Sequence, residues 1–237
     1  MLAVIDERLP KACRDSLCRL GFSLLPLPPF PRLSSPVASH PDMLLLKIED
    51  RLFCHEEYYK IAKNEIQKIL DTSGLSLCLT DDAVSNSYPL DVSLNLVFTG
   101  NLLIGKKDTV AKKVKEYAED CQIPIVSVKQ GYAKCSSLVL ENAIVTADLG
   151  IETAAKNAGL DTLRITNGGV ILPPYPYGFL GGASGACGKT VFFCGSIDRH
   201  PDGASITAFC RSHGYEVISL SNEPLFDAGT ILFFDSI

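Results

Sequence analysis

Residues 181–190, GGASGACGKT, are the segment whose composition most directly suggests chemistry. From Ala183 onward they fit the relaxed pattern A/G-x-x-x-x-G-K-S/T of a phosphate-binding loop. Such a loop needs a helix directly after Lys189 and Thr190, because the N–H groups at the helix start cradle the phosphate. Here VFFC follows, which is typical of a strand, and proline-broken LPPYPYGFLGG precedes. The sequence therefore predicts no ATP or GTP binding at this segment.

Two cysteines and three aspartates stand at comparable places along the chain, each shortly before an apolar segment. They are Asp42, Asp91, Cys135, Cys187 and Asp227. If these positions are equivalent in a closed repeat, the five side chains converge near its central axis. Carboxylates and thiols that face one cavity there need partners, because a buried charge must be neutralised or hydrogen-bonded. A guanidinium or amidinium group is such a partner, since its planar fork of N–H donors matches a carboxylate.

An internal repeat accounts for this spacing. Residues 39–79, 88–128, 132–166 and 181–220 each favour the order strand, strand, helix, strand. In three of these units a glycine stands where a helix end requires positive φ, namely Gly74, Gly159 and Gly214. In the last unit we expect GKTVFFC to be the opening strand, preceded by Cys187.

The N-terminal unit lacks an opening strand, and one is found at the C-terminus. Residues 1–27 contain LAVID, a helix near residues 10–19 and FSLLPL, while Asp227 precedes AGTILFFD. We therefore predict one α/β domain over residues 1–237, a five-bladed α/β-propeller of ββαβ repeats. Pairing of residues 225–237 with residues 1–27 closes it and removes exposed strand edges. The alternative is an ordinary α/β sandwich whose units look alike.

Five ββαβ units closed by the C-terminal strand resemble the penteins. This superfamily contains arginine deiminases, dimethylarginine hydrolases and amidinotransferases, and also the non-catalytic translation initiation factor 6. In arginine deiminases the nucleophilic cysteine follows a glycine-rich stretch that opens the last unit, and GGASGAC ending at Cys187 is similar to it. The H-x-D motif of the superfamily is matched by His40-Pro41-Asp42.

The resemblance implies a cysteine thiolate that attacks the guanidinium carbon, with a histidine that relays protons. On this basis we expect Cys187 and His40 to be catalytic. Asp42, Asp91, Asp227 and Cys135 are the expected substrate-binding residues, and no cofactor or metal is expected. The enzymes carry the histidine motif in the unit before the cysteine, where this chain has Lys134-Cys135-Ser136-Ser137.

Each of these residues also has a structural interpretation. Both cysteines are also compatible with small buried core residues, Cys135 more so than Cys187. The three aspartates are compatible with caps of turns at strand entrances, and His40 with an exposed loop before proline.

The long segment 167–185 leads to Cys187 and carries Tyr175, Tyr177 and Phe179. It predicts either a lid over the axis or a rigid proline-braced connector.

The amino-acid composition argues against nucleic acids and membranes as binding partners of this protein. A net charge of -5 with 21% charged residues lacks the basic footprint of a nucleic-acid binder. No apolar run approaches the roughly 20 residues of a membrane helix. The N-terminus has no basic region before Asp6 and Glu7, and the nine cysteines form no C-x-x-C pair, so we expect a cytoplasmic protein.

Two functions remain open from the sequence. The first is an enzyme that acts on a guanidino or amidino C–N bond and binds a small guanidino-type ligand. The second is a non-catalytic pentein that binds a protein or a small ligand. The H-x-D motif lies in the second unit instead of the unit before Cys187, which favours the second function. The three aspartates expected near the axis and the glycine-rich segment before Cys187 favour the first.

Overall fold

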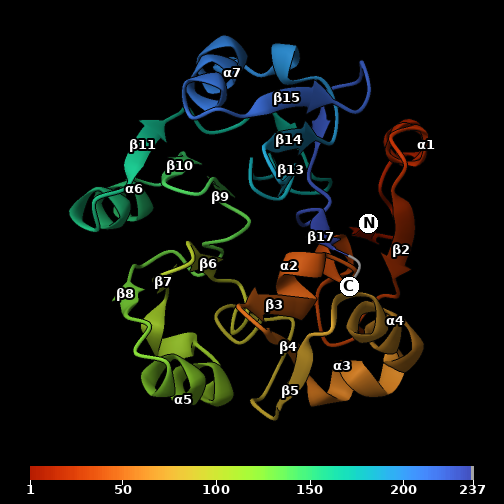
Figure 1. The fold of residues 1–237 in the computed structure, drawn as a ribbon, viewed down its shortest axis with the longest axis vertical. Coiled ribbons are helices and arrows are strands. Elements are labelled where there is room, and N and C mark those ends of the chain that lie inside the picture. Colours follow the sequence, from red (N-terminus) through yellow and green to blue (C-terminus); the bar gives the residue numbers. More distant parts are fainter. Residues whose placement is uncertain (236–237) are drawn as a thin grey trace.

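The computed structural model describes residues 1–235, which form a mixed α/β fold. Within these residues there are five three-stranded sheets with one common pattern. In each, the central strand pairs antiparallel with one neighbour and parallel with the other. Figure 1 shows the sheets placed around a common centre, with helices α1, α4, α5, α6 and α7 on the outside.

The strands are short, as the apolar segments predicted. The first sheet is β17 (Leu232–Phe234), β1 (Leu2–Asp6) and β2 (Ser23–Leu27). The second is β3 (Leu45–Ile48), β4 (Arg51–His55) and β5 (Ser76–Thr80), and the third is β6 (Val97–Phe98), β7 (Leu103–Gly105) and β8 (Ile125–Ser127). The fourth is β9 (Ser137–Val139), β10 (Ala143–Thr146) and β11 (Asp161–Arg164), and the fifth is β13 (Ser184–Cys187), β14 (Thr190–Phe193) and β15 (Glu216–Ser219). A separate parallel pair joins β12 (Val170–Ile171) to β16 (Leu225–Phe226).

In each of the five three-stranded sheets, a helical segment connects the two parallel strands. These are α1 (Lys11–Arg19), the pair α3 (Glu56–Ile61) and α4 (Lys63–Ser73), α5 (Lys112–Asp120), α6 (Leu149–Asn157) and α7 (Gly203–Ser212). The predicted glycine stops are confirmed, because Gly74, Gly159 and Gly214 all have positive φ just after their helices. Short turns of helix occur at η1 (Ser35–Val37), α2 (Pro41–Leu44), η2 (Lys107–Thr109) and η3 (Ile197–Arg199). Among residues 1–235, no helix combines the length and the hydropathy needed to cross a membrane.

The predicted pairing of the chain ends is present. Strand β17 runs antiparallel to β1, with Phe234 opposite Leu2. Both side chains are buried and belong to the same apolar cluster. Residues 236 and 237, which the predicted first unit also included, lie outside the described residues.

The strand assignment of the last unit was wrong. The opening strand is β13, which ends at Cys187, and a turn at Gly188 with φ of 55° leads into β14. TVFF is thus the central strand of its sheet. The error arose because SGAC lacks bulky β-branched residues and was not recognised as a strand. Strand β14 directly after GK agrees with the exclusion of a phosphate-binding loop.

Phe234→Ala tests whether β17 stabilises the N-terminal sheet. Phe234 is 1% exposed, and its truncation is expected to lower the free energy of unfolding by about 3–5 kcal/mol. Urea unfolding followed by circular dichroism measures this. The matched control is Leu149→Ala at a side chain that is 62% exposed, for which a change within about 0.5 kcal/mol is expected. Equal effects of the two substitutions would contradict the role of β17.

Candidate active site

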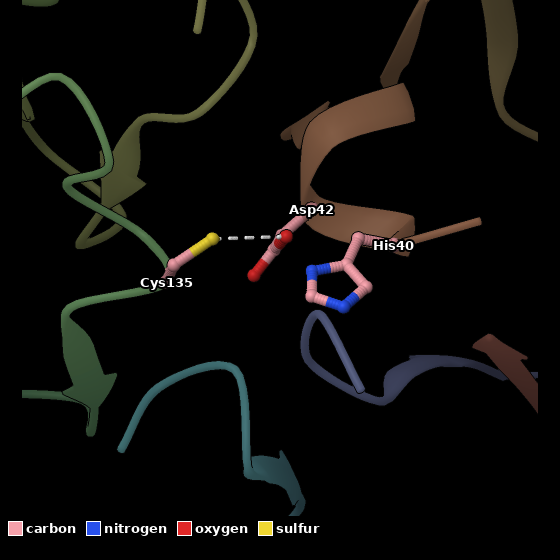
Figure 2. Close-up of side chains that lie close together, drawn as sticks. All are labelled: His40, Asp42 and Cys135. Atoms are coloured by element: carbon pink, nitrogen blue, oxygen red, sulfur yellow. Dashed lines mark hydrogen bonds between the residues drawn. The ribbon is translucent and has the colours of Figure 1, made fainter. Parts of the chain in front are cut away.

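A thiol, a carboxylate and an imidazole meet at the inner ends of two sheets. His40 and Asp42 precede β3, and Cys135 precedes β9. One ligand-capable atom from each lies within 4.8 Å of the other two, and all three residues are buried (Figure 2). Pro41 lies in the first turn of α2, where its missing N–H costs nothing, and this short turn carries Asp42 to the centre.

The Cys135 thiol is hydrogen-bonded on two sides. Its Sγ donates to Asp42 Oδ1 at 3.2 Å and accepts from Asn95 Nδ2 at 3.0 Å. Asn95 Nδ2 also lies 3.0 Å from the carbonyl oxygen of Asp42. The thiol is therefore oriented rather than free to rotate.

Sequence reasoning missed Asn95, which is fully buried. Its Oδ1 accepts from the backbone N–H groups of Lys134 and Cys135 at 2.9 and 3.2 Å. One amide side chain thus fixes both the backbone and the sulfur of Cys135. The available signal was an asparagine within the largely apolar run VSLNLVF.

Thr230 is a second residue that the motif search did not identify. Its Oγ1 lies 2.8 Å from Asp42 Oδ2 and 2.9 Å from the carbonyl oxygen of Gly181, and it accepts from Lys134 Nζ at 3.2 Å. Thr230 has φ of 66°, a conformation that a β-branched residue adopts only at a cost in free energy. Its hydroxyl group holds this conformation through contacts to three residues.

His40 lies between two further carboxylates. Its Nδ1 is 3.8 Å from Asp227 Oδ1, and its Nε2 is 3.6 Å from Asp6 Oδ2. Within residues 1–235 neither ring nitrogen has a hydrogen-bond partner. Asp6 pairs with Arg8, whereas Asp227 accepts from the N–H groups of Phe179 and Gly229 at 2.8 and 3.1 Å. The imidazole is thus held near acids, with both nitrogens available.

Burial is the main cause of the pKa shifts of Cys135, Asp227 and Lys134. It raises the pKa of Cys135 well above 9.0, and the negative charges of Asp42 and Asp227 add to this. Burial also raises the pKa of Asp227, against the opposing effect of His40, and it lowers the pKa of the half-buried Lys134. A cation bound here would favour the ionised forms of Cys135 and Asp227, because opposite charges stabilise each other.

The structure does not bring Cys187 to this cluster. Its Sγ lies 2.8 Å from the sulfur of Met1, and the charged groups that influence its pKa are Asp235 and the N-terminal amine. The misassigned strand explains the difference, since Cys187 ends β13 instead of preceding the opening strand. Among the described residues, the side-chain hydrogen bond of Cys187 goes to Met1 and not to a histidine or a carboxylate, and its role as a nucleophile stays a prediction.

The glycines at the start of the segment do lie at the centre. A Cβ atom on Gly182 would overlap the carboxylate of Asp227, and one on Gly181 would lie 2.6 Å from the carbonyl oxygen of Cys135. A side chain at either position would displace the cluster. The segment GGASGAC is thus part of the site through its glycines.

Asp91 lies beside the cluster rather than within it. Its Oδ2 accepts from the hydroxyl of Tyr132 at 2.5 Å, and Tyr132 lines the cavity described next. Asp91 therefore orients a wall residue of the cavity.

A cavity of about 250 Å³ opens onto the cluster. His40, Cys135 and Asp227 line it, and so do Tyr175, Tyr177 and Phe179 from the long loop. These three aromatic residues therefore lie beside the cluster, and both the lid and the rigid connector stay open as interpretations of the segment 167–185. The atoms of His40, Asp42 and Cys135 are also close enough to ligate one metal ion, so the expected absence of a metal stays a prediction.

The chain has the fold of the pentein superfamily. It is similar to a DDAH from Pseudomonas aeruginosa, a cysteine-to-serine variant complexed with citrulline, at 10% identity over 93% of this chain and 92% of that chain, with a TM-score of 0.59. It is similar to a dimethylarginine dimethylaminohydrolase, a histidine-to-glycine variant bound as an adduct with S-methyl-L-thiocitrulline, at 11% identity, the same coverages and a TM-score of 0.59. An amidinotransferase of saxitoxin biosynthesis from Microseira wollei shares 11% identity over 93% and 88% of the two chains, with a TM-score of 0.50.

The family is defined by sequence. Residues 4–232 match the model of a family of unknown function, DUF6873, and the chain belongs to this family. Among curated proteins, no sequence matches the chain significantly.

Thr230→Val tests the hydroxyl at the centre of the cluster. Valine keeps the shape and the unfavourable φ but removes the hydrogen bonds of the hydroxyl to Lys134 Nζ and Asp42 Oδ2, so a loss of about 1–3 kcal/mol of stability is expected. Thr230→Ser keeps the hydroxyl and is the control, with an expected loss within about 1 kcal/mol. Thermal or urea unfolding measures both variants. A valine variant as stable as the serine variant would show that these hydrogen bonds contribute nothing.

Proposed function

We propose that this protein is an enzyme that cleaves a guanidino or amidino C–N bond, with Cys135 as the nucleophile. The observation that carries the proposal is the approach of the Cys135 thiol, the Asp42 carboxylate and the His40 imidazole within 4.8 Å beside a cavity. This assigns to Cys135 the role that the sequence assigned to Cys187, and keeps His40 as acid and base.

The charges at the cavity suit a planar cation. Asp227 lines the cavity, and Asp42 lies directly behind Cys135. The Asp227 carboxylate can accept from the forked donors of a guanidinium or amidinium group, whereas Asp42 does not line the cavity and acts on Cys135. Asp91 then acts as a positioning residue for Tyr132 instead of a direct substrate anchor.

The proposed reaction begins when the Cys135 thiol gives its proton to Asp42. The thiolate forms a C–S bond to the central carbon of the cation, and the electron pair of the C=N bond moves to nitrogen. The bond to the departing amine then breaks with its electron pair, as protonated His40 donates a proton to that nitrogen.

Water completes the cycle. It attacks the carbon of the covalent intermediate while neutral His40 accepts one of its protons. The C–S bond then breaks with its electron pair on sulfur, and the remaining hydroxyl proton passes to the released amine, which leaves a neutral urea or amide. The Cys135 thiolate recovers its proton from Asp42. Each residue thus returns to its initial protonation state.

The relatives support the proposal at the level of the fold. One solved structure holds citrulline, and another holds an adduct with S-methyl-L-thiocitrulline. We also propose that the sheets form a closed five-bladed propeller over a single domain, since β17 and β1 pair at the chain ends.

One observation favours the alternative, a non-catalytic protein that binds a cation or a partner. The pKa of Cys135 lies well above 9.0 because of burial, so the thiol is protonated at neutral pH in the free protein. In this alternative Cys135 only donates a hydrogen bond to Asp42.

Selective labelling distinguishes the two functions. A haloacetamidine, which carries the amidinium group, is expected to alkylate Cys135 at least tenfold faster than the neutral haloacetamide does, because the cation binds beside Asp227 and favours the thiolate. Peptide mass spectrometry over the nine cysteines measures this. Cys187→Ser is the matched control and is expected to be labelled as the wild type is. Labelling centred on Cys187, or spread evenly over the cysteines, would overturn the assignment.

The pH dependence of labelling by the neutral haloacetamide tests the raised pKa of Cys135. Only the thiolate reacts, so the rate below the pKa rises about tenfold for each pH unit. Because burial raises the pKa above 9.0, the rate is expected to increase through pH 9 with no earlier plateau. Rates at Cys135 between pH 6 and pH 10 provide the measurement. A plateau below pH 8 would contradict the protonated resting state.

A further inference from the structure

We propose that the substrate of this site carries an apolar, aromatic or alkyl, substituent on its guanidino or amidino group and bears no carboxylate. The inference rests on the proposed function and specifies its substrate class. It is carried by the side chains that line the cavity above Cys135.

The wall of the cavity is aromatic and aliphatic. Four rings line it, and three aliphatic side chains complete it, whereas His40, Cys135 and Asp227 are the remaining lining residues. The rings are those of Tyr132, Tyr175, Tyr177 and Phe179, and the aliphatic residues are Val37, Leu172 and Pro176. A ligand with its cationic end at Asp227 would thus place its other end against apolar surface.

Phe179 couples the two ends of the cavity. Its backbone N–H donates to Asp227 Oδ2 at 2.8 Å, and both residues line the cavity. The ring of Tyr132 is tilted by 30° to that of Phe179 at 6.2 Å, and the ring of Tyr177 stands at 82° to it at 6.4 Å. Rings in both orientations can contact a cation and a flat apolar group at once.

The charge of the cavity disfavours a ligand carboxylate. None of its lining residues within 1–235 is a lysine or an arginine. Two cationic side chains near the cluster are engaged by other residues, because Arg8 binds Asp6 and Lys134 binds Thr230. A carboxylate on the ligand would face Asp227 and the electron-rich ring faces without a compensating cation.

The volume limits the size of the substituent. A cavity of about 150 Å³ can hold benzene, and pockets for drug-sized ligands begin near 300 Å³. At about 250 Å³, this cavity fits an amidine or guanidine with one ring or a short alkyl chain. Tyr175 and Tyr177 at the mouth are 46% and 39% exposed, so a longer chain would pass between them into solvent.

A matched ligand series tests the inference. Calorimetric binding to the full-length Cys135→Ser variant is measured for butylguanidine, phenylguanidine, 4-guanidinobutyrate, arginine and neutral benzamide. Butylguanidine and phenylguanidine are expected to bind at least tenfold more tightly than 4-guanidinobutyrate and arginine. In the wild-type protein, protection of Cys135 against alkylation by these ligands is expected to follow the same order. This second measurement tests the inference even if the Cys135→Ser variant does not fold.

The outcomes separate the inference from the function on which it rests. If 4-guanidinobutyrate or arginine binds as tightly as butylguanidine, the apolar substrate class is wrong while the cation site stands. If no cation binds, or if benzamide binds as tightly as phenylguanidine, the cation site itself fails and the inference fails with it. If the apolar cations bind but the wild type hydrolyses none of them, the ligand class is supported and the catalytic proposal fails.

A wall variant locates the substituent. Tyr175→Ala is expected to weaken the binding of phenylguanidine at least threefold and to leave the binding of unsubstituted guanidinium unchanged. Ile61→Ala, at a side chain that is 47% exposed on α3 and does not line the cavity, is the control and is expected to change neither. An equal loss for both ligands in Tyr175→Ala, or no loss for phenylguanidine, would place the substituent elsewhere and overturn the inference.

Discussion

The buried carboxylate of Asp42 is the group on which the arrangement of the centre depends. Its two oxygens accept from Cys135 before β9 and from Thr230 before β17. Its backbone N–H donates to the carbonyl oxygen of Gly229, and its own carbonyl oxygen accepts from Asn95. Segments from four different parts of the chain thus meet at one residue, since a buried carboxylate without such partners would be unfavourable by several kcal/mol, on the order of the whole stability margin of a domain.

Close backbone approach makes this convergence possible. Gly182 lies against Asp227, and Gly229, with φ of 65°, lies against the ring of His40. A Cβ atom at either position would overlap these side chains. Glycine therefore serves here to admit neighbouring polar side chains to a space that has no room for another carbon.

The electrostatics of the centre and the chemistry of the cavity are consistent with each other. Acidic groups surround a protonated thiol and a histidine whose ring nitrogens are unpartnered within residues 1–235, and this combination favours a cationic ligand over an anionic one. The aromatic wall then provides contacts for the part of the ligand that does not react. Asp227 provides negative charge for the cationic end of a ligand, and the aromatic wall provides apolar contact area for its other end.

The sequence by itself determined the local structure and the order of the units. Apolar segments of four to five residues and the glycines after the helices are local signals, so the strands β1, β4 and β14 and the ends of α4, α6 and α7 could be predicted from short windows. The pairing of β17 with β1 was predicted because the first unit lacked a strand that the last residues contained. The repeat predicted the place of Asp42 near the centre, and the H-x-D motif of the family resemblance added His40.

Only the tertiary structure decided which cysteine thiol lies beside His40 and Asp42. Cys135 and Cys187 each precede an apolar segment, but Cys187 ends β13 at the turn of its hairpin, whereas Cys135 precedes the opening strand β9. Asn95, Thr230 and Asp6 likewise carry no local motif, and they matter through bonds or ion pairs to residues that are 34 to 188 positions away in the chain. Such contacts depend on how the sheets are placed relative to one another, and that placement results from packing of the whole chain rather than from any single segment.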